Sequence, residues 1–258
     1  MFSKEANQIL FYPERPSRHS VIFKILKRLN YSFTKNIKKD FSLIVRWEDT
    51  TFRKIELPSQ EPECPIINKD CNDISKEHID RVFEKVFGYR LNVDPLKFKG
   101  NILQKSHLNA VKDGKIIDSP IKATDNAFVY QKIINNYEPG LGFEDIRVPI
   151  FKTDIPLVFF KYRNFEKRFS DSFEKSFIKL PSDVFSLAET KKIISFSLAI
   201  GLDYGELDIL RDRDSGKIYI IDANNTPWGP PDELSDQETD QVLEVFAEHF
   251  HQIFIHKV

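Results

Sequence analysis

Hydrophobic positions that recur three and four residues apart predict four helices in the chain. Ser75, Ser186 and Ser235 each stand at the start of such a segment, where a hydroxyl group can cap the first turn. Gly88 and Gly201 follow two of these segments, and glycine favours the backbone turn that ends a helix. The helices are therefore expected at residues 18–30, 75–87, 187–200 and from Ser235 towards the C-terminus.

Short runs rich in β-branched and aromatic residues predict strands between these helices. The turn segments 152–154 and 214–216 make hairpins of the strands on either side of them. Antiparallel strands with interspersed helices indicate an α+β fold. The expected strands are 41–47, 101–105, 115–118, 127–133, 145–151, 155–163, 204–210 and 217–223.

A turn-rich segment divides the chain into two parts. Pro58 to Pro65 contains three prolines and reads as a linker. We expect a short α/β segment at residues 1–65 and a larger domain at residues 66–258.

Charge is balanced, with 38 Lys and Arg residues against 39 Asp and Glu residues. This argues against nucleic acid or membrane partners that bind through broad charge attraction. Residues 1–20 are charged and lack the apolar run of a signal peptide, and no stretch has the apolar length of a membrane helix. We expect a cytoplasmic protein; the sequence leaves the oligomeric state open, including a homodimer.

The number and spacing of the cysteines and glycines exclude several classes of site. Two cysteines cannot form a disulfide framework, and Cys64, Cys71 and His78 do not have the number or spacing of a zinc site. The chain has only 9 glycines in 258 residues and lacks the glycine-rich loops in which backbone amides hold phosphate.

The hairpin at residues 204–223 carries the clearest chemical signal. If its turn is centred on Ser215, Asp208 lies opposite Asp222 and Glu206 lies opposite Asn224. Side chains alternate along a strand, so these four share one face. The opposite, apolar face is expected to hold Leu207, Ile209, Tyr219, Ile221 and Ala223.

Three acids and an asparagine on one face require a cation to offset their repulsion. Oxygen ligands without His or Cys suit a hard ion such as Mg²⁺. The alternative is a solvated face of an exposed hairpin. The in-phase acids, the clean apolar face and the unusual exit at residues 224–231 favour the metal site.

An acid on one strand, followed on the next by a hydrophobic residue and then Asp222-Ala-Asn-Asn-Thr-Pro227, resembles the metal-binding end of the ATP-grasp fold. Three further segments occur in the matching order and resemble the family's nucleotide-binding elements: Asp73–Lys76, Ile102–Ser106 and Phe128–Ile133. The Asp-x-Arg strand Asp145–Val148 resembles the ribosomal-modification and glutathione-synthetase-like branch. Lys161–Arg163, followed by Arg168, stands where that branch has a basic hairpin that contacts phosphate or substrate.

The resemblance covers about residues 70–234 and implies two α+β subdomains that grip a nucleotide, preceded by a shortened α/β domain. It implies that ATP and Mg²⁺ are the cofactors. Each role is carried over to the matching residue of this chain. Asp208, Asp222 and Asn224 would hold Mg²⁺; Lys76 and Lys105 would contact phosphates; the backbone of Tyr130, Gln131, Lys132 and Ile133 would meet adenine; Arg147 and Arg163 would stabilise the transferred phosphoryl group.

The sequence departs from the family pattern at three positions. Residues 107–114, which correspond to the family's flexible lid, contain Gly114 as their single glycine, so we expect a stiffer lid segment. Gln131 replaces the usual acid of the hinge, and Asp222 replaces the more common Glu.

The leading hypothesis is an ATP- and Mg²⁺-dependent ligase that activates a carboxylate as an acyl-phosphate and joins it to an amine or another nucleophile. Its substrates would be small molecules or peptides. One alternative is an ATP-grasp phosphotransferase or a protein tied to saccharide or peptide assembly. Another is a non-catalytic nucleotide-binding module.

Overall fold

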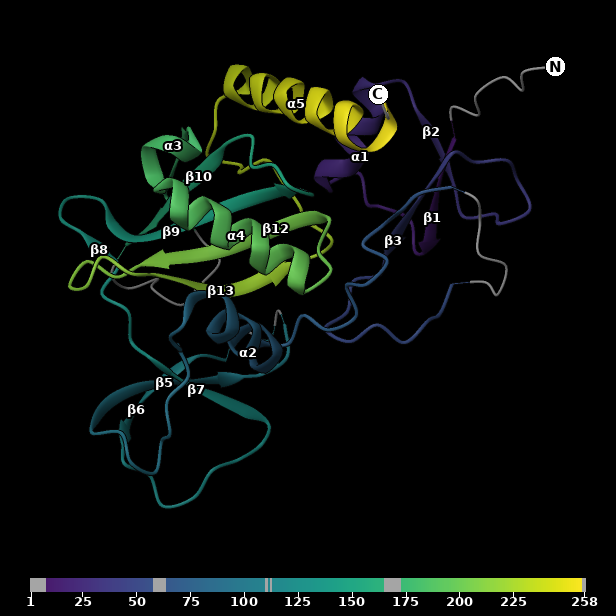
Figure 1. Ribbon diagram of the computed structural model, residues 1–258. Coiled ribbons are helices and arrows are strands. Elements are labelled where there is room, and N and C mark those ends of the chain that lie inside the picture. The colour runs from purple at the N-terminus through teal and green to yellow at the C-terminus, as the bar shows by residue number, and fades with distance from the viewer. Residues whose placement is uncertain (1–7, 58–63, 110, 112, 165–172, 257–258) are drawn as a thin grey trace.

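A computed structural model describes residues 8–57, 64–109, 111, 113–164 and 173–256 of the chain, which form three sheets (Figure 1). The first sheet has the order β2-β1-β3-β4, and its paired strands run parallel. Helix α1 (Val21–Arg28) connects β1 to β2 and buries Ile22 and Ile25. The strands are β1 (Gln8–Pro13), β2 (Ser32–Thr34), β3 (Leu43–Trp47) and β4 (Ile66–Ile67).

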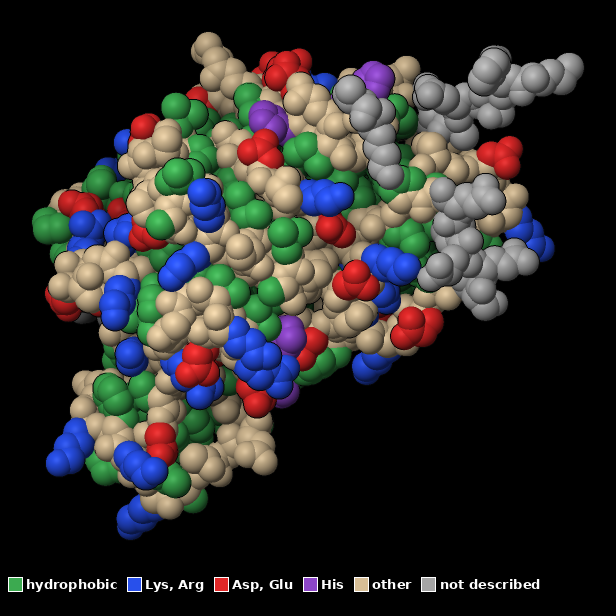
Figure 2. Space-filling view, viewed as in Figure 1, with side chains coloured by type: hydrophobic (Ala, Val, Ile, Leu, Met, Phe, Trp, Pro, Cys, Tyr) green, Lys and Arg blue, Asp and Glu red, His purple; other side chains and the backbone are tan. Residues whose placement is uncertain are grey.

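A three-stranded antiparallel sheet follows helix α2 (Lys76–Phe87). The Ser75 hydroxyl accepts a hydrogen bond from the His78 amide at the start of α2, and Gly88 ends the helix with a φ of 84°. The sheet has the order β6-β5-β7, with β5 (Gly100–Ser106), β6 (Lys115–Ser119) and β7 (Phe128–Lys132). It forms a lobe that projects from the rest of the molecule (Figure 2).

The large antiparallel sheet has the order β11-β10-β9-β12-β13, with β8 paired to β9. The Asp208–Asp222 and Glu206–Asn224 pairs occur as the alternation predicts. Its strands are β8 (Tyr137–Glu138), β9 (Gly142–Phe151), β10 (Val158–Arg163), β11 (Lys175–Lys179), β12 (Tyr204–Arg211) and β13 (Ile218–Asn224). The remaining helices are α3 (Pro181–Val184), α4 (Leu187–Ala199), α5 (Asp236–Phe250) and the short π-helix η2 (His251–Ile255).

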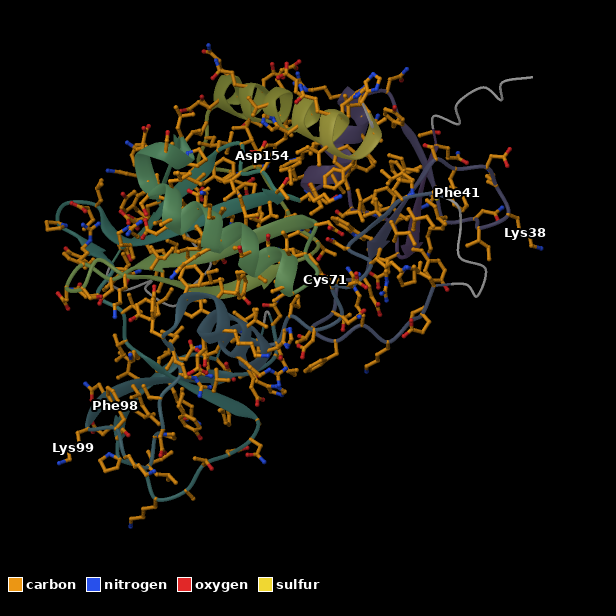
Figure 3. The ribbon with its side chains drawn as sticks, viewed as in Figure 1. Lys38, Phe41, Cys71, Phe98, Lys99 and Asp154 are labelled. Atoms are coloured by element: carbon orange, nitrogen blue, oxygen red, sulfur yellow. The ribbon has the colours of Figure 1, made fainter. Side chains whose placement is uncertain are left out.

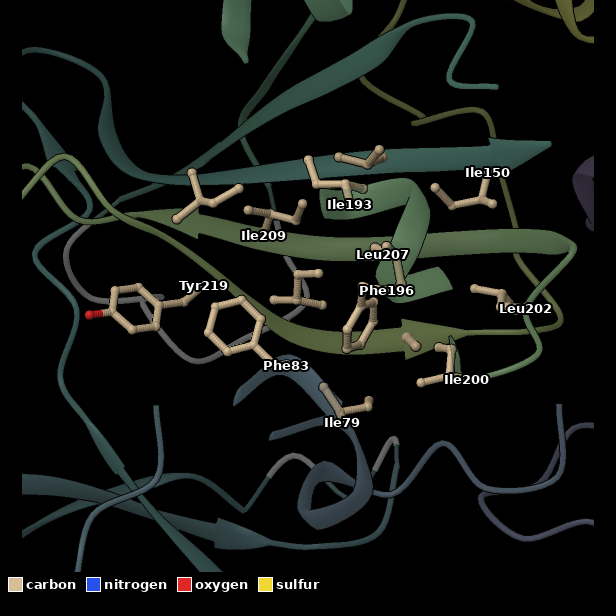
Figure 4. Packing of buried hydrophobic residues seen from close by; sticks show 14 of the residues in the cluster. Ile79, Phe83, Ile150, Ile193, Phe196, Ile200, Leu202, Leu207, Ile209 and Tyr219 are labelled. Carbon is tan, nitrogen blue, oxygen red and sulfur yellow. The ribbon is translucent and has the colours of Figure 1, made fainter. Parts of the chain in front are cut away.

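One face of the large sheet is apolar and is covered by α2 and α4. Phe83 of α2 and Phe196 of α4 pack against Leu207 and Ile209 of β12 in a continuous buried cluster (Figure 4). Capping boxes at Ser186 and Ser235 fix the starts of α4 and α5, as the sequence predicts.

The other face of the large sheet changes character along the strands. At one end, Phe151, Phe159 and Tyr204 are fully or almost fully buried and share a core with Phe246 of α5 and with the first sheet. Helix α5 lies beside α1 over this end (Figure 1). Asp154 lies beneath α5, with its carboxylate 3.2 Å from His249 Nε2 (Figure 3). The opposite end of the same face carries charged side chains.

The expected α+β class is confirmed, and each expected helix and strand has a counterpart. The sequence pattern did not reveal β1, β2, β4, β8, β11 or α3. Most of these are short, and β1 lies in the charged N-terminal stretch. The division at residue 65 stays a prediction; most of the expected linker lies outside the described residues, and β4 joins the first sheet just beyond that boundary.

A β-bulge corrects one expectation about the acidic hairpin. The register shifts after Asp208, so that Ile209 pairs with Ile220 instead of Ile221. The extra residue, Ile221, lines the cavity described below and also packs against the apolar cluster, on the face where strict alternation placed it.

Among the described residues, no helix combines the length and apolarity needed to cross a bilayer.

Candidate active site

A cavity of about 850 Å³ lies where the charged end of the large sheet meets the small sheet and the N-terminal part of the chain. Each of these regions contributes side chains to its wall. The large sheet provides Asp208, Asp222 and Asn224, the small sheet provides Lys105, and α1 provides Lys24.

The three expected metal ligands lie together on this wall. Asp208 and Asp222 are directly opposed on β12 and β13, and Asn224 follows two residues later on the same face. The Asn224 side-chain oxygen accepts a hydrogen bond of 2.9 Å from the Thr226 amide, which fixes its orientation. Burial raises the pKa of Asp222, although Lys76 opposes this shift.

The Arg147 guanidinium forms an ion pair with the Asp208 carboxylate. Its Nε lies 3.0 Å from Oδ1 and its Nη2 lies 3.4 Å from Oδ2, while Glu206 Oε2 is 3.6 Å from the same Nε. Burial alone would raise the pKa of Asp208, but the charge and hydrogen bond of Arg147 lower it overall. The arginine therefore offsets the negative charge of this acid.

Arg163 forms a second buried pair with Asp145, at 2.6 Å between Nη2 and Oδ2. Burial raises the pKa of Asp145 to about 6, against the opposing charge of Arg163. The Phe173 ring lies over this end of the cavity, with its centroid 4.1 Å from the Arg163 guanidinium carbon. Arg168 lies outside the described residues.

The two expected phosphate-binding lysines approach the acids from the other side of the cavity. Burial, reinforced by the charge of Lys76, lowers the pKa of Lys105 to about 8, while Asp222 opposes this shift. The Lys76 ammonium donates a 2.7 Å hydrogen bond to the Leu108 carbonyl, and its amide donates to the His107 carbonyl at 3.0 Å. Lys76 thus holds the lid segment.

Only part of the expected hinge, residues 130–133, lines the cavity. Gln131, Lys132 and Ile133 line it, whereas Tyr130 is not among the lining residues. The Tyr130 carbonyl accepts from the Val93 amide at 2.9 Å, and the Lys132 amide donates to the Leu91 carbonyl at 3.0 Å. These bonds occupy backbone groups that the family resemblance assigned to adenine.

The lid segment is tied to two other parts of the molecule. The Asn109 amide donates to Thr51 Oγ1 at 2.9 Å, and its side-chain nitrogen donates to the Ala223 carbonyl of β13 at 3.2 Å. Asp113 accepts from the Ser106 amide at 2.8 Å. The lid segment is therefore anchored by side-chain bonds at Leu108, Asn109 and Asp113.

Sequence reasoning left several charged wall residues without an assigned role. Asp145 and Lys161 stood inside the quoted motifs, and their two-residue spacing from Arg147 and Arg163 puts each pair on one strand face. That alternation could have found them. Lys24 and Glu233, in contrast, come from a helix and a loop whose sequence carries no signal of a site.

The oxygen atoms of Asp208, Asp222 and Asn224 suit a Mg²⁺ ion that is also bound by the phosphates of a ligand. In the described part of the chain, no group of three or more His, Cys, Asp and Glu side chains is arranged to hold a metal. Asp208, Asp222 and Asn224 supply two carboxylates and one amide oxygen. Mg²⁺ is commonly held by one or two carboxylates and completes its shell with water and substrate phosphates.

Comparisons with known proteins identify the fold. No protein family model matches the chain, and no curated protein matches it in sequence. Among solved structures, the chain is similar to the ATP-grasp ligase PsnB complexed with minimal precursor, Mg and ADP, with a TM-score of 0.54, 10% identity and coverage of 96% of this chain and 99% of that chain.

Two other structures have the same TM-score of 0.54. An ATP-grasp RimK domain protein from Sphaerobacter thermophilus shows 8% identity over 96% of this chain and 100% of its own. The VanG D-Ala:D-Ser ligase from Enterococcus faecalis shows 8% identity over 84% and 74%. The match to PsnB with minimal precursor alone spans 71% of this chain and 65% of that chain, at a TM-score of 0.47 and 14% identity.

The protein has the ATP-grasp fold. The resemblance stated from the sequence motifs is confirmed at the level of the fold.

Proposed function

We propose that the protein is an ATP- and Mg²⁺-dependent ligase that activates a carboxylate by phosphoryl transfer and joins it to an amine or another nucleophile. One observation carries the proposal: Asp208, Asp222 and Asn224 face Lys76 and Lys105 across a single cavity. A site for a nucleoside triphosphate needs acids that hold Mg²⁺ and, opposite them, lysines that hold the phosphates. The known ligases of this fold named above support the reaction type.

The nucleotide is expected to lie with its adenine at Gln131–Ile133 and its phosphates between Lys105 and the acids of the large sheet. Since Tyr130 and Lys132 already use backbone groups in bonds to residues 91–93, the adenine edge is expected to meet the backbone at Ile133. A cavity of about 850 Å³ is within the usual range for ligand sites.

The reaction follows from the charges on the wall. A substrate carboxylate oxygen attacks the γ-phosphorus, the bond from that phosphorus to the bridging oxygen of ADP breaks, and an acyl-phosphate forms. The nucleophile then attacks the acyl carbon, loses its proton and releases inorganic phosphate. The guanidinium groups of Arg147 and Arg163 stabilise the negative charge on the transferred group, which is the main demand of phosphoryl transfer.

Asp208, Asp222 and Asn224 would hold Mg²⁺, which would supply positive charge to the phosphate oxygens. Asp208 is paired with Arg147 and would have to be released to take part. We therefore expect Arg147 to leave Asp208 when Mg²⁺ and nucleotide bind. The freed guanidinium, with its planar set of donors, can then bind the phosphoryl or acyl-phosphate oxygens.

The test replaces Asp222 with Asn and measures ADP release over a panel of amino acids, short peptides and carboxylic acids. We expect the unchanged protein to bind Mg²⁺-ATP by calorimetry and D222N to release ADP roughly a hundredfold more slowly, since a metal contributes several kcal/mol to charge stabilisation. Asp118→Asn, at an exposed position on β6 outside the cavity, is the matched control and should be unaffected.

Product analysis separates the alternatives. An amide or ester with ADP and inorganic phosphate supports the ligase, whereas a stable phosphorylated product supports a phosphotransferase. Absence of Mg²⁺-ATP binding, or full activity of D222N, contradicts the proposal.

A further inference from the structure

The segment that leaves β13 lies against the N-terminal part of the chain. The Val21 amide donates a hydrogen bond of 3.1 Å to the Pro227 carbonyl, and the Lys24 ammonium donates one of 2.7 Å to the Gly229 carbonyl. These bonds fix the backbone shortly after the proposed metal ligand Asn224. The N-terminal part therefore contributes to the geometry of the metal site, although it supplies none of the expected ligands.

Thr226 connects this backbone to Asn224. It is 5% exposed, and its amide donates to Asn224 Oδ1 at 2.9 Å. Its hydroxyl oxygen lies 3.4 Å from the same Oδ1 atom and 3.3 Å from Asp49 Oδ1. The hydroxyl group thus has two acceptors within reach, one on a proposed metal ligand and one on the N-terminal part.

The Asp49 carboxylate is the better acceptor of the two. A threonine hydroxyl carries a single proton, so it cannot donate fully to both oxygens. A hydrogen bond to a carboxylate is roughly twice as strong as one to a neutral amide oxygen. Asp49 lines the cavity, and its amide donates to Glu14 Oε2 at 3.1 Å, which holds this residue beside Thr226.

The direction of the Thr226 proton decides how much of Asn224 is available to a cation. An amide oxygen has two lone pairs, and the Thr226 amide uses one of them. If the hydroxyl also turned to Asn224, both lone pairs would be engaged. With the hydroxyl turned to Asp49, the second lone pair is free to bind a metal ion.

We infer that Asp49 is a positioning residue for the metal site, which keeps Asn224 Oδ1 free for Mg²⁺ by accepting the proton of the Thr226 hydroxyl. This rests on the proposed function and adds a contact from outside the large sheet. The alternative is that Asp49 acts on the cation only through its negative charge.

The test measures the affinity for ADP by calorimetry, once with Mg²⁺ and once with EDTA. The ratio of the two dissociation constants reports the contribution of the metal, because the binding of metal and nucleotide is linked. Asp49→Ala should lower this ratio about tenfold, as substitutions of groups that orient metal ligands commonly do. Its affinity for ADP in EDTA should equal that of the unchanged protein. Asp49→Asn, which keeps an acceptor oxygen but no charge, should stay within about threefold of the unchanged ratio.

Two further variants isolate the role of the Thr226 hydroxyl. In Thr226→Val the hydroxyl is absent, so adding D49A to T226V should lower the ratio no further. Asp40→Ala removes another exposed acid of the N-terminal part, outside the cavity, and should leave the ratio unchanged. Equal losses in D49A and D49N, or the full D49A loss in the T226V background, overturn the inference and leave the proposed function intact.

A measurement without ligands decides the case in which Mg²⁺ does not change the affinity for ADP, which would contradict the proposed function itself. Urea unfolding of D49A, T226V and the double variant tests the bond between Thr226 and Asp49. If the bond exists, the two changes in the unfolding constant should be non-additive by about threefold. Additive changes overturn the assignment of the hydroxyl proton to Asp49.

Discussion

At the scale of single residues, Glu206 is a buried carboxyl group whose negative charge is unfavourable in the folded protein. It is 4% exposed, and its Oε2 atom is buried without a hydrogen bond. Burial raises the pKa of Glu206 to about 7, with Asp208 adding to the shift and Arg147 opposing it. The carboxyl group is therefore partly protonated near neutral pH.

This pKa predicts how the free energy of unfolding depends on pH. A carboxyl whose pKa is higher in the folded state than in the unfolded state contributes stability that is complete below about pH 4.3 and is lost as the pH rises through 7. We expect Glu206→Gln to lose less stability than the unchanged protein between pH 4.5 and 8, by about 1–3 kcal/mol. Urea unfolding at both pH values, without Mg²⁺, measures the difference.

The control for this prediction is Glu56→Gln, at an exposed position of the N-terminal part. Its pH dependence should follow that of the unchanged protein. If E206Q also gives a parallel profile, the buried carboxyl is not the source of the pH dependence.

The sequence predicted the positions of those cavity residues for which residue type and strand periodicity lead to the same conclusion. The alternation of Glu206 and Asp208 against Asp222 and Asn224 was sufficient to predict their pairing. It could not predict the shift of register after Asp208, because a bulge adds one residue without changing the local composition. Nor could periodicity show that Tyr130 bonds to Val93, since that contact depends on a loop 37 residues earlier.

At the scale of elements, the lid segment is held by hydrogen bonds to two different parts of the chain. The Asn109 amide is held by Thr51 in the N-terminal part, and its side chain is held by Ala223, next to the proposed metal ligand Asp222. The scarcity of glycine in residues 107–114 predicted a stiff segment. It could not predict these bonds, because both partners are distant in sequence.

We expect Asn109→Ala to loosen this segment. Losing one hydrogen bond of about 1 kcal/mol should increase amide hydrogen exchange in the peptide covering residues 103–116 by about fivefold. Mass spectrometry after deuterium labelling measures this change. Asn101→Ala, at an exposed position on β5, should leave the exchange of the lid unaltered; equal exchange in both variants would show that Asn109 does not restrain the segment.

At the scale of the whole molecule, the first sheet and the large sheet share one core. Ile22 of α1, Val45 of β3, Phe151 of β9 and Phe246 of α5 belong to the same buried cluster. The proline-rich linker predicted two parts of the chain. Because their apolar surfaces are buried against each other, we expect the two parts to unfold together.

The variant Phe246→Ala tests this coupling. It should lower the free energy of unfolding by about 3–5 kcal/mol and leave a single transition when the first sheet and the large sheet are monitored separately. Buried Trp47 reports on the first sheet, and hydrogen exchange of β9 reports on the large sheet. Leu187→Ala, at a position that is 71% exposed, is the control; two separate transitions in F246A would argue for independent domains.

The two-sided use of β9 and β10 has an evolutionary consequence. Phe151 and Arg147 occupy the same face of β9, and Lys161 and Phe159 occupy the same face of β10, so one strand face is core at one end and cavity wall at the other. A single insertion or deletion within β10 would exchange its faces, sending Lys161 into the apolar layer and Phe160 towards the substrate. We therefore expect a change in the length of either strand to be more damaging than a conservative substitution within it.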